Sequence, residues 1–307
     1  MRRTALNCIH ELATKDERVV FIGSDITKRD VTAFAEEFPN RFFMEGIYEQ
    51  HLIGMAAGLA LSGKIPFINT IATFLTRRCF EQILVDLCMH NLPVRLIGSG
   101  GGVVYAPLGG THIALEDIAI LRAIPNITII SPSDAEEMKR LMPHTLNWPY
   151  PIYIRLAKGG DPILASKNNT FEIGKAITVT EGDKIVFIST GTTTYIAKQA
   201  ADILAKDGID VGVVHVHTIK PLDKEMILNT IAEAQIVLTI EEHRITGGLG
   251  SALSELIAEE HKGKAIKFKR IGFPDIFTEE LGSQNEIMGK YGITVENILK
   301  TTKELLH

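Results

Sequence analysis

The 307-residue sequence lacks the features that mark several special classes of protein. It has no excess of basic residues, since 32 lysines and arginines stand against 37 aspartates and glutamates, and this excludes an electrostatic footprint for nucleic acid. The longest uncharged apolar run, Leu52–Ser62, is far shorter than the roughly 20 residues that cross a bilayer. Asn7, His10 and Glu11 interrupt any signal-peptide core after the opening Met-Arg-Arg. We therefore expect no membrane contact.

Cysteine is also scarce. The three cysteines, Cys8, Cys79 and Cys88, form no CxxC pair and no metal-ligand spacing. We expect them to be small buried apolar residues in a reducing compartment, which predicts a cytoplasmic protein whose chain supplies no metal ligands.

The composition and length of the sequence predict a globular protein. The content of 45% apolar and 22% charged residues argues against disorder, and the length suffices for two domains. Apolar strand patterns alternate with helical patterns along both halves, which predicts the α/β class: two doubly wound domains with mostly parallel sheets. We expect domains at 1–160 and 176–307, joined by a polar linker at 161–175 that begins within a segment rich in Gly, Pro and Asn.

The first half is arranged around residues 42–83. An apolar segment ends at Glu49, which opens a helix of small residues. A buried strand is predicted at 65–71, followed by a second helix that carries Arg77 and Phe80. One carboxylate and several aromatic rings are thus held near strand ends, where open α/β sheets bind their ligands.

Two motifs in this stretch resemble a known family. Residues 46–60, GIYEQHLIGMAAGLA, are similar to G-I-x-E-Q-x-x-x-x-x-A-A-G-L-A, and residues 73–87, TFLTRRCFEQILVDL, are similar to T-F-L-x-R-x-x-x-Q-I-x-x-D. Both patterns are those of the pyrimidine-binding domain of thiamine-diphosphate enzymes, in the branch of transketolases and deoxyxylulose-phosphate synthases. The second half, with IKPLD and EEHRITGGLG, resembles the C-terminal domain shared by transketolases and the β subunits of 2-oxoacid dehydrogenases.

The resemblance implies that Glu49 is catalytic. In this family the matching acid shares a proton with the ring nitrogen of the cofactor's aminopyrimidine, whose imino form then deprotonates the thiazolium carbon. Such an acid must keep its proton near neutral pH, which an apolar pocket favours, and we expect walls from Phe43, Ile47, Phe74 and Phe80. By itself, an acid at a helix start is equally well explained as a cap that the helix dipole stabilises by roughly 0.3–1 kcal/mol.

The resemblance also implies further cofactor contacts. Phe74 and Phe80 match aromatic residues that stack on or flank the aminopyrimidine, although burial in a core is the usual fate of such rings. Arg77 matches an arginine typical of the deoxyxylulose-phosphate synthase branch. Asp25, after the first strand, matches an acid that approaches the cofactor.

For the substrate, the resemblance points to three residues. His112 matches the family's Thr-His, whose imidazole faces the sugar's carbonyl and hydroxyl groups and can exchange protons. Arg155 matches a phosphate-binding arginine, and Arg2 or its neighbour matches another. The family usually has an acidic residue four positions before this histidine, and this chain has Leu108 there. The glycines at 100 and 101 stand where the family often carries Arg or His, and we expect the glycine run at 100–102 to form a flexible lip.

A further absence predicts a partner. The G-D-G…N motif, which holds Mg²⁺ or Ca²⁺ and the diphosphate in the resembled enzymes, does not occur in the sequence. The resemblance therefore implies a split transketolase that needs an N-terminal subunit with the diphosphate-binding domain. We expect homodimerisation through the pyrimidine-binding domain, with Ala56, Ala57 and Gly58 at the dimer axis, and an α2β2 heterotetramer.

The implied activity is transfer of a two-carbon ketol unit from a ketose to an aldose. Two enzyme alternatives remain: a 2-oxoacid dehydrogenase E1 β-type subunit and a deoxyxylulose-phosphate-synthase-like carboligase. The first usually carries an H-S-Q-S segment where this chain has Gly-Thr-His. A non-catalytic structural or regulatory subunit is the other alternative. Retention of Glu49 argues against it, because a buried acid without a cofactor only lowers stability.

Overall fold

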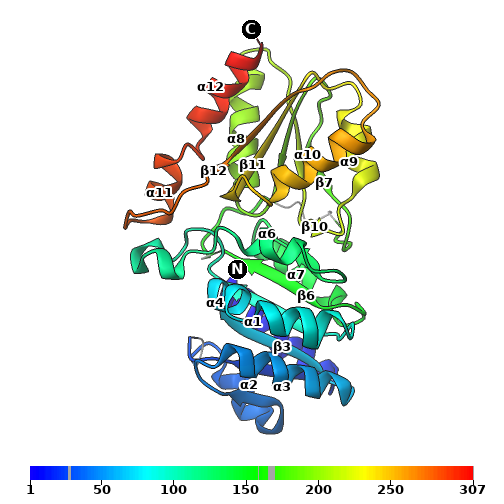
Figure 1. Cartoon of the computed structure of the whole chain (residues 1–307), viewed down its shortest axis with the longest axis vertical. Coiled ribbons are helices and arrows are strands. Elements are labelled where there is room, and N and C mark those ends of the chain that lie inside the picture. The colour runs from blue at the N-terminus through cyan, green and yellow to red at the C-terminus, as the bar shows by residue number, and fades with distance from the viewer. Residues whose placement is uncertain (27–28, 158, 165–169, 307) are drawn as a thin grey trace.

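The protein consists of two α/β units, one at each end of an elongated molecule (Figure 1). The structure is a computed structural model that describes residues 1–26, 29–157, 159–164 and 170–306. The C-terminus lies at the far end of the second unit, and the N-terminus lies near the boundary between the two. Part of the predicted linker, 165–169, lies outside the described residues. The predicted fold class is confirmed.

The first sheet has seven strands in the order β10-β5-β6-β4-β3-β1-β2. Six of them are parallel, and their carboxyl ends meet at one edge, while β10 is antiparallel to β5. The strands span Val19–Gly23 (β1), Phe42–Met44 (β2), Ile65–Ile71 (β3), Arg95–Ser99 (β4), Thr128–Ile130 (β5), Ile152–Leu156 (β6) and Thr218–Lys220 (β10). The strand predicted at 65–71 is confirmed, and it is buried throughout, as expected of a central parallel strand.

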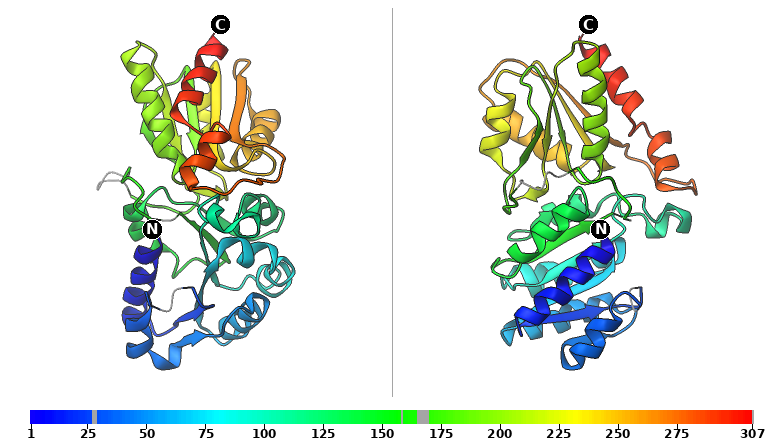
Figure 2. Two further views of the ribbon diagram at one scale, coloured as in Figure 1. Left: turned by 90° about the vertical axis from the view of Figure 1, so that its left-hand side faces the viewer. Right: turned by 180° about the vertical axis from the view of Figure 1, so that it is seen from behind.

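Helices cover both faces of this sheet (Figure 2). One apolar core lies beneath helices α1 (Arg2–Lys15), α2 (Thr32–Glu37) and α7 (Ala135–His144). The other lies beneath α3 (Glu49–Leu61), α4 (Ala72–Arg77), α5 (Phe80–Gln82), the π-helical η2 (Ile83–Cys88) and α6 (Asp117–Arg122). Three short 3₁₀ turns are η1 (Pro39–Arg41), η3 (Ala106–Leu108) and η4 (Gly110–His112). The predicted two-sided covering is therefore present.

Two expectations about these helices are wrong. Ala56 and Ala57 do not face a dimer axis, because both are buried in this chain's own core, while Gly54 and Gly58 are the small residues of α3 that face open space. The second helix is not continuous. It breaks after Arg77 into short α and π segments.

The second sheet has five strands in the order β12-β11-β8-β9-β7, all parallel except β7. They span Ile177–Thr180 (β7), Ile185–Ser189 (β8), Gly212–His215 (β9), Ile236–Arg244 (β11) and Lys267–Phe273 (β12). The helices are α8 (Thr193–Lys206), α9 (Lys224–Ile231), α10 (Leu249–Glu260), α11 (Gln284–Lys290) and α12 (Val295–Leu306). The sequence analysis assigned neither the edge strands β7 and β12 nor the last two helices.

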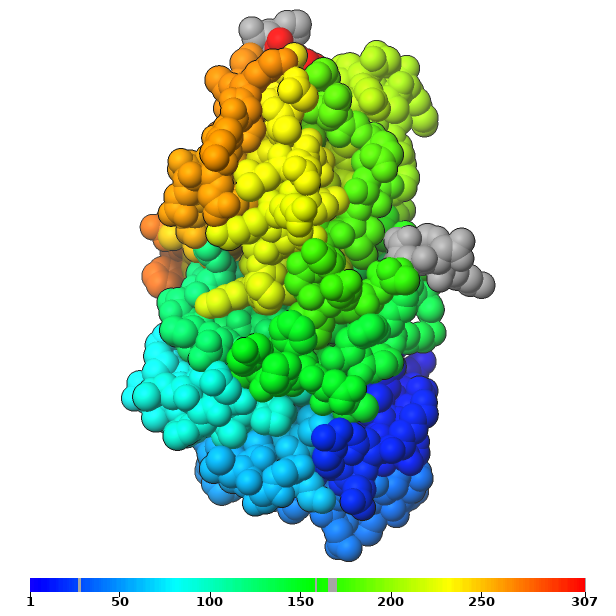
Figure 3. Space-filling model, turned by 90° about the vertical axis from the view of Figure 1, so that its right-hand side faces the viewer, coloured from blue at the N-terminus to red at the C-terminus, as the bar shows by residue number. Residues whose placement is uncertain are grey.

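The two units are joined by more than the linker. Strand β10 comes from the second half of the chain but completes the sheet of the first half. Arg155 donates a hydrogen bond of 2.9 Å to the Glu242 carbonyl, and the Glu242 carboxylate accepts one of 2.8 Å from the Val103 N–H. In the space-filling view of one face the two units pack directly on each other (Figure 3).

The glycine run at 100–102 lies in this boundary and is buried, so the expected flexible lip is wrong. A Cβ atom on Gly100 would come within 2.1 Å of the Tyr105 ring, and one on Gly102 within 2.2 Å of the Glu242 carboxylate. On Gly101 it would meet the Arg155 side chain at 2.5 Å. Any side chain here would collide with its neighbours. Gly100 and Gly101 make room for Tyr105 and Arg155 of the first unit, and Gly102 allows Glu242 of the second unit to approach closely.

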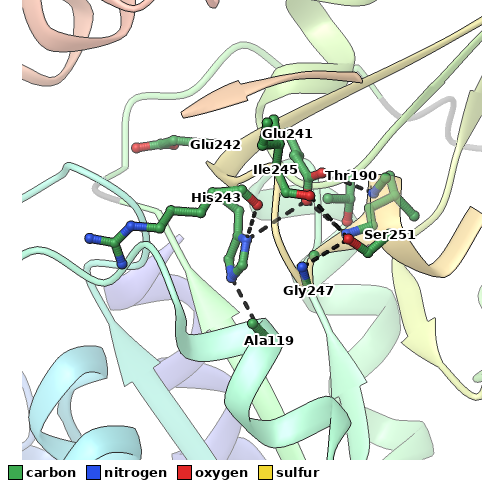
Figure 4. Close-up of polar contacts among 12 residues, drawn as sticks. Ala119, Thr190, Glu241, Glu242, His243, Ile245, Gly247 and Ser251 are labelled. Carbon is green, nitrogen blue, oxygen red and sulfur yellow. Dashed lines mark hydrogen bonds and ion pairs between the residues drawn. The ribbon is translucent and has the colours of Figure 1, made fainter. Parts of the chain in front are cut away.

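The end of β11 supplies the buried acids of the boundary (Figure 4). Glu241 accepts hydrogen bonds of 2.7 and 2.9 Å from the N–H groups of Leu249 and Gly250, at the start of α10. Glu242 points to the other side of the strand, toward the first unit. Burial raises the pKa of Glu242 to about 7, although Arg155 opposes the shift.

Among the described residues, none of the helices combines the length and apolar character needed to cross a bilayer.

The raised pKa of Glu242 predicts a pH dependence. The pKa of Glu242 is 4.5 in the unfolded chain and about 7 in the folded chain, so at pH values between these two the folded chain binds the proton more tightly. The contribution of this group to stability is therefore present below pH 4.5 and is lost as the pH rises through 7. Glu242→Gln removes this loss. The difference in unfolding free energy, variant minus wild type, should rise by up to about 3 kcal/mol from pH 4.5 to 8.

Urea unfolding at a series of pH values measures this difference. Exposed Glu259→Gln is the matched control and should give a difference that does not change with pH. A difference in unfolding free energy for Glu242→Gln that also does not change with pH would contradict the raised pKa of Glu242.

Candidate active site

The predicted catalytic acid, Glu49, lies at the carboxyl edge of the first sheet. It is the first residue of α3, which begins five residues after β2 ends, and its side chain is 1% exposed. Of the four apolar residues predicted to wall it, Phe74 lines the adjacent cleft, while Phe43 and Phe80 pack against the core on the α3 side of the sheet. Ile47 is exposed. The surroundings of the carboxyl are therefore less apolar than expected.

A chain of polar side chains connects Glu49 to the end of β1. The Thr70 hydroxyl donates to Glu49 Oε1 at 3.4 Å, and the Ser24 hydroxyl lies 3.0 Å from the Thr70 hydroxyl. Asp25 lies next in line, 3.4 Å from Ser24 Oγ, with its own side chain exposed. The structure thus places Asp25 and Glu49 at the same edge of the sheet, as expected for residues that follow parallel strands.

Arg78, which the sequence analysis did not name, is the direct partner of Glu49. Its Nη1 forms an ion pair with Glu49 Oε2, and its guanidinium carbon lies 4.6 Å from the centre of the Phe74 ring. The signal was present in the sequence, since Arg78 follows Phe74 by four residues and such residues share one face of a helix. Counted from T-F-L, the family pattern places its arginine at Arg77, but counted back from Q-I it falls on Arg78, and only Arg77 was named.

Phe74 connects this pair to the second predicted catalytic residue. The rings of Phe74 and His112 are 5.1 Å apart and meet edge to face. His112 Nδ1 lies 2.9 Å from the Thr111 hydroxyl, and Arg77 donates to the Thr111 carbonyl at 2.9 Å. Residues from two distant motifs therefore come together around one aromatic ring.

Phe74, Arg77, Arg78 and Thr111 line a cleft of about 900 Å³, whereas Glu49 and His112 do not line it and reach it through their contacts with Arg78 and Phe74. The first unit contributes Thr73, Phe74, Arg77, Arg78, Gly110, Thr111, Ile113 and Glu116, and the second unit contributes Arg244, Phe277 and Thr278. The sequence analysis missed the contribution of the second unit, because no motif marks it. The hydroxyl of Thr73 is buried and has no hydrogen-bond partner among the described residues, so the cleft wall holds a polar group available to a ligand.

Charge in the cleft is arranged in pairs. One carboxylate oxygen of Glu116 forms an ion pair with Arg77 Nε at 3.2 Å, and the other accepts a hydrogen bond from Arg244 Nη1 at 2.7 Å. Since Arg244 ends β11 of the second unit, this carboxylate ties both units into one wall.

Three predicted residues lie outside this group. Phe80 is partly buried in the core and does not line the cleft. Arg155 is buried in the boundary between the units, where Asp117 and two backbone carbonyls take its donors. Burial opposes ionisation of Asp117, but Arg155 and His243 hold the pKa of its carboxyl below the ordinary value. Arg2 contacts Asp30 and the Tyr105 hydroxyl, both at 3.4 Å.

The arrangement fits a planar nitrogen heterocycle such as an aminopyrimidine. A buried carboxyl, an aromatic face and an unpartnered hydroxyl converge from Glu49, Phe74 and Thr73. The Arg78 guanidinium, which is also planar and carries N–H donors, occupies the carboxyl and the aromatic face. Within the part of the chain that the structure describes, no group of three or more His, Cys, Asp or Glu side chains is placed to hold a metal ion.

Comparisons with known families cover both units. The family described as "Transketolase, pyrimidine binding domain" matches residues 1–160, and "Transketolase, C-terminal domain" matches residues 174–298.

Individual relatives agree with these matches. The chain is 34% identical to "6-deoxy-6-sulfo-D-fructose transketolase subunit SqwH" of Clostridium sp. (strain MSTE9), over 99% of this chain and 94% of the relative. It is 36% identical to "1-deoxy-D-xylulose-5-phosphate synthase" of Heliobacterium modesticaldum, over 96% of this chain but 45% of that enzyme. A solved structure, "Split gene transketolase, inactive beta4 tetramer", superposes with a TM-score of 0.91 at 34% identity, over 99% of this chain and 97% of that one.

The shared carboxylate of Glu116 predicts a stability effect. Glu116→Gln leaves two arginines of the cleft wall without their charged partner and should cost about 1–3 kcal/mol of unfolding free energy. Urea unfolding measures it. The matched control is Glu255→Gln, whose carboxylate pairs with Arg122 but is 59% exposed, and which should cost at most about 1 kcal/mol. Equal effects of the two substitutions would contradict the proposed tie between the units.

Proposed function

Because this chain belongs to the transketolase family, we propose that it is the subunit of a split transketolase that carries the pyrimidine-binding and C-terminal domains. Together with a partner subunit it transfers a two-carbon ketol unit from a ketose to an aldose. The observation that carries this proposal is the buried carboxyl of Glu49 beside the Phe74 ring, at the edge of the sheet that borders the cleft. We also propose domains at 1–160 and 176–307, supported by family matches at 1–160 and 174–298.

The cofactor of the proposed reaction is thiamine diphosphate. When bound, it supplies a nucleophilic carbon that cleaves the bond beside a ketose carbonyl and carries the two-carbon unit. Glu49 holds a proton at the ring nitrogen of the aminopyrimidine, Phe74 supports the face of the ring, and the Thr73 hydroxyl is available to a polar atom of the ring. Asp25 and Arg77 border the same cofactor from the ends of neighbouring elements.

His112 is the proposed proton carrier for the substrate. It stands on the η4 turn at the cleft and contacts Phe74, so a sugar bound above the ring would lie within reach of its imidazole. Imidazole is suited to taking and returning hydroxyl protons near neutral pH. We assign no direct substrate contact to Arg155, because its donors are engaged at the domain boundary.

The partner subunit supplies the diphosphate-binding domain and holds the Mg²⁺ or Ca²⁺ ion. Two findings support the existence of a separate partner subunit. The relative from Clostridium is called a subunit and has nearly the length of this chain, whereas the single-chain synthase is about twice as long. The similar solved structure is called an inactive β4 tetramer. We propose an α2β2 assembly, in which two copies of this chain meet through their pyrimidine-binding domains.

A second candidate is a carboligase of the deoxyxylulose-phosphate synthase type. Arg77 and the 36% identity to such an enzyme favour it. The two reactions differ in the transferred unit: a transketolase delivers a ketol carrying a hydroxyl at C1, whereas a 1-deoxy product lacks that oxygen. Mass spectrometry of the product distinguishes them.

We also propose that the protein is cytosolic. This is supported by Cys8, Cys79 and Cys88, which are all buried free thiols in the structure, as a reducing compartment allows.

Glu49→Gln tests the proposed function. The substitution keeps the size of the side chain but removes the acidic proton, so turnover by the complete complex should fall by roughly 10²–10⁴-fold. Exposed Glu17→Gln is the matched control and should keep wild-type turnover. Size-exclusion chromatography should show the intact complex for both variants. Undiminished turnover of an assembled Glu49→Gln complex would leave a structural or regulatory role as the only explanation for this subunit.

The isolated chain should be inactive. Light scattering at micromolar concentration should show self-association, and turnover of ketoses with thiamine diphosphate and Mg²⁺ should begin only when the partner subunit is added. A monomer, or turnover by this chain alone, would contradict the proposed assembly.

A further inference from the structure

Three arginines line the cleft, and they pair unevenly with two carboxylates, Glu116 of the cleft wall and the buried Glu49. Arg77 and Arg244 take one oxygen each of Glu116, at 3.2 and 2.7 Å. Arg78 alone takes Glu49. Each arginine of the cleft therefore has a carboxylate partner, but only the partner of Arg78 is the acid that the proposed reaction requires.

Arg78 occupies the contacts that the aminopyrimidine ring would make. Its N–H donates to Glu49 Oε2, and its planar group lies 4.6 Å from the centre of the Phe74 ring. The carboxylate of Glu49 and the face of the Phe74 ring can together accommodate only one planar donor group at a time. The side chain of Arg78 is 37% exposed, whereas that of Glu49 is 1% exposed. The arginine thus reaches inward from the open cleft and can swing back into it.

We propose that Arg78 is an exchangeable occupant of the ring site, and that its guanidinium, once released by the cofactor, binds the anionic end of the sugar substrate. This inference rests on the proposed transketolase function. It assigns a substrate-binding role to Arg78, which was not named as a site residue from the sequence.

The charge pattern explains why the released arginine would bind an anion. After the exchange, Arg78 is the one guanidinium among the described cleft residues that has no carboxylate partner, because Glu116 still occupies Arg77 and Arg244. An arginine in this position suits a tetrahedral oxyanion, either phosphate or sulfonate. The names of the relatives, a sulfosugar transketolase subunit and a sugar-phosphate synthase, both indicate anionic sugars.

The exchange has opposite consequences for two ligands. In the cofactor-free chain the ion pair competes with the ring, so the apparent affinity for the cofactor is lowered by the fraction of molecules in which the site is taken. Removing the arginine should therefore strengthen cofactor binding and weaken anion binding. A residue that only maintains the shape of the cleft would weaken both when it is replaced.

Arg78→Met tests the proposal in the complex of this chain with its diphosphate-binding partner. By isothermal titration calorimetry the variant should bind thiamine diphosphate roughly fivefold to tenfold more tightly than wild type. In the cofactor-loaded variant, inorganic phosphate and methanesulfonate should bind roughly tenfold more weakly. Whichever probe the loaded wild type binds more tightly identifies the preferred oxyanion.

Two further variants serve as controls. Arg78→Lys retains the positive charge and should recover part of the anion binding. Arg18→Met removes an arginine that pairs with Asp16 at 2.7 Å and does not line the cleft, so both affinities should stay at their wild-type values.

The isolated chain gives an independent readout. Arg78→Met leaves the buried carboxyl of Glu49 without its ion pair and should lower the midpoint of thermal unfolding. Adding Glu49→Gln to this variant should restore much of the loss, because the uncompensated charge is then absent. Additive losses would overturn the claim that the pair stabilises the cofactor-free chain.

The outcomes separate this inference from the proposed function. If the wild-type complex binds thiamine diphosphate but Arg78→Met binds it no more tightly, or binds both anions as wild type does, the role of Arg78 is overturned and the proposed function stands. If the wild-type complex binds no thiamine diphosphate at all, the proposed function fails, and this inference fails with it.

Discussion

A carboxyl group withdrawn from water is the constraint on which the rest of this structure depends. Glu49 is almost completely buried at the start of a helix, and an unpaired charge in such a place lowers stability. In the chain by itself, Arg78 satisfies this carboxyl from the cleft side and Thr70 from the sheet side. The same burial makes Glu49 useful, because a carboxyl shielded from water can hold a proton at a defined atom of a bound ring. The side chain of Glu49 therefore requires partners for stability in the chain by itself and also performs the proposed chemistry.

The second unit does more than extend the chain. Its strand β10 completes the first sheet, its Glu242 enters the boundary, and its Arg244 reaches the cleft wall. The close approach depends on Gly102, because a side chain there would collide with Glu242 of the second unit, whereas Gly100 and Gly101 leave room for Tyr105 and Arg155 within the first unit. The position of the cleft wall is therefore set jointly by both units, although the residues proposed as catalytic, Glu49 and His112, lie in the first.

Sequence reasoning could predict the fold class, the central strands and the place of Glu49 at the start of a helix, because these depend on local apolar patterns and on short motifs. It could not predict contacts between segments far apart in the chain. Arg155 was matched to a phosphate-binding arginine but is buried against Asp117, and Ala56 and Ala57 face the core rather than a partner. The pairing of Arg78 with Glu49 joins residues 29 positions apart, so only the folded chain shows it. The glycine run at 100–102 shows the same limit. Its composition suggested a flexible segment, but in the folded chain these glycines are buried, where neighbouring side chains leave no room for larger residues.

The central claim is that the carboxyl of Glu49 holds a proton at the aminopyrimidine of thiamine diphosphate. A crystal structure of the complete complex with the cofactor tests it most directly. A Glu49 oxygen should lie within about 2.6–3.2 Å of the nitrogen of the six-membered ring. Phe74 should lie against the ring, and Arg78 should have left the carboxyl. A ring bound elsewhere, or a Glu49 side chain that remains paired with Arg78 while the cofactor is bound, would contradict the account.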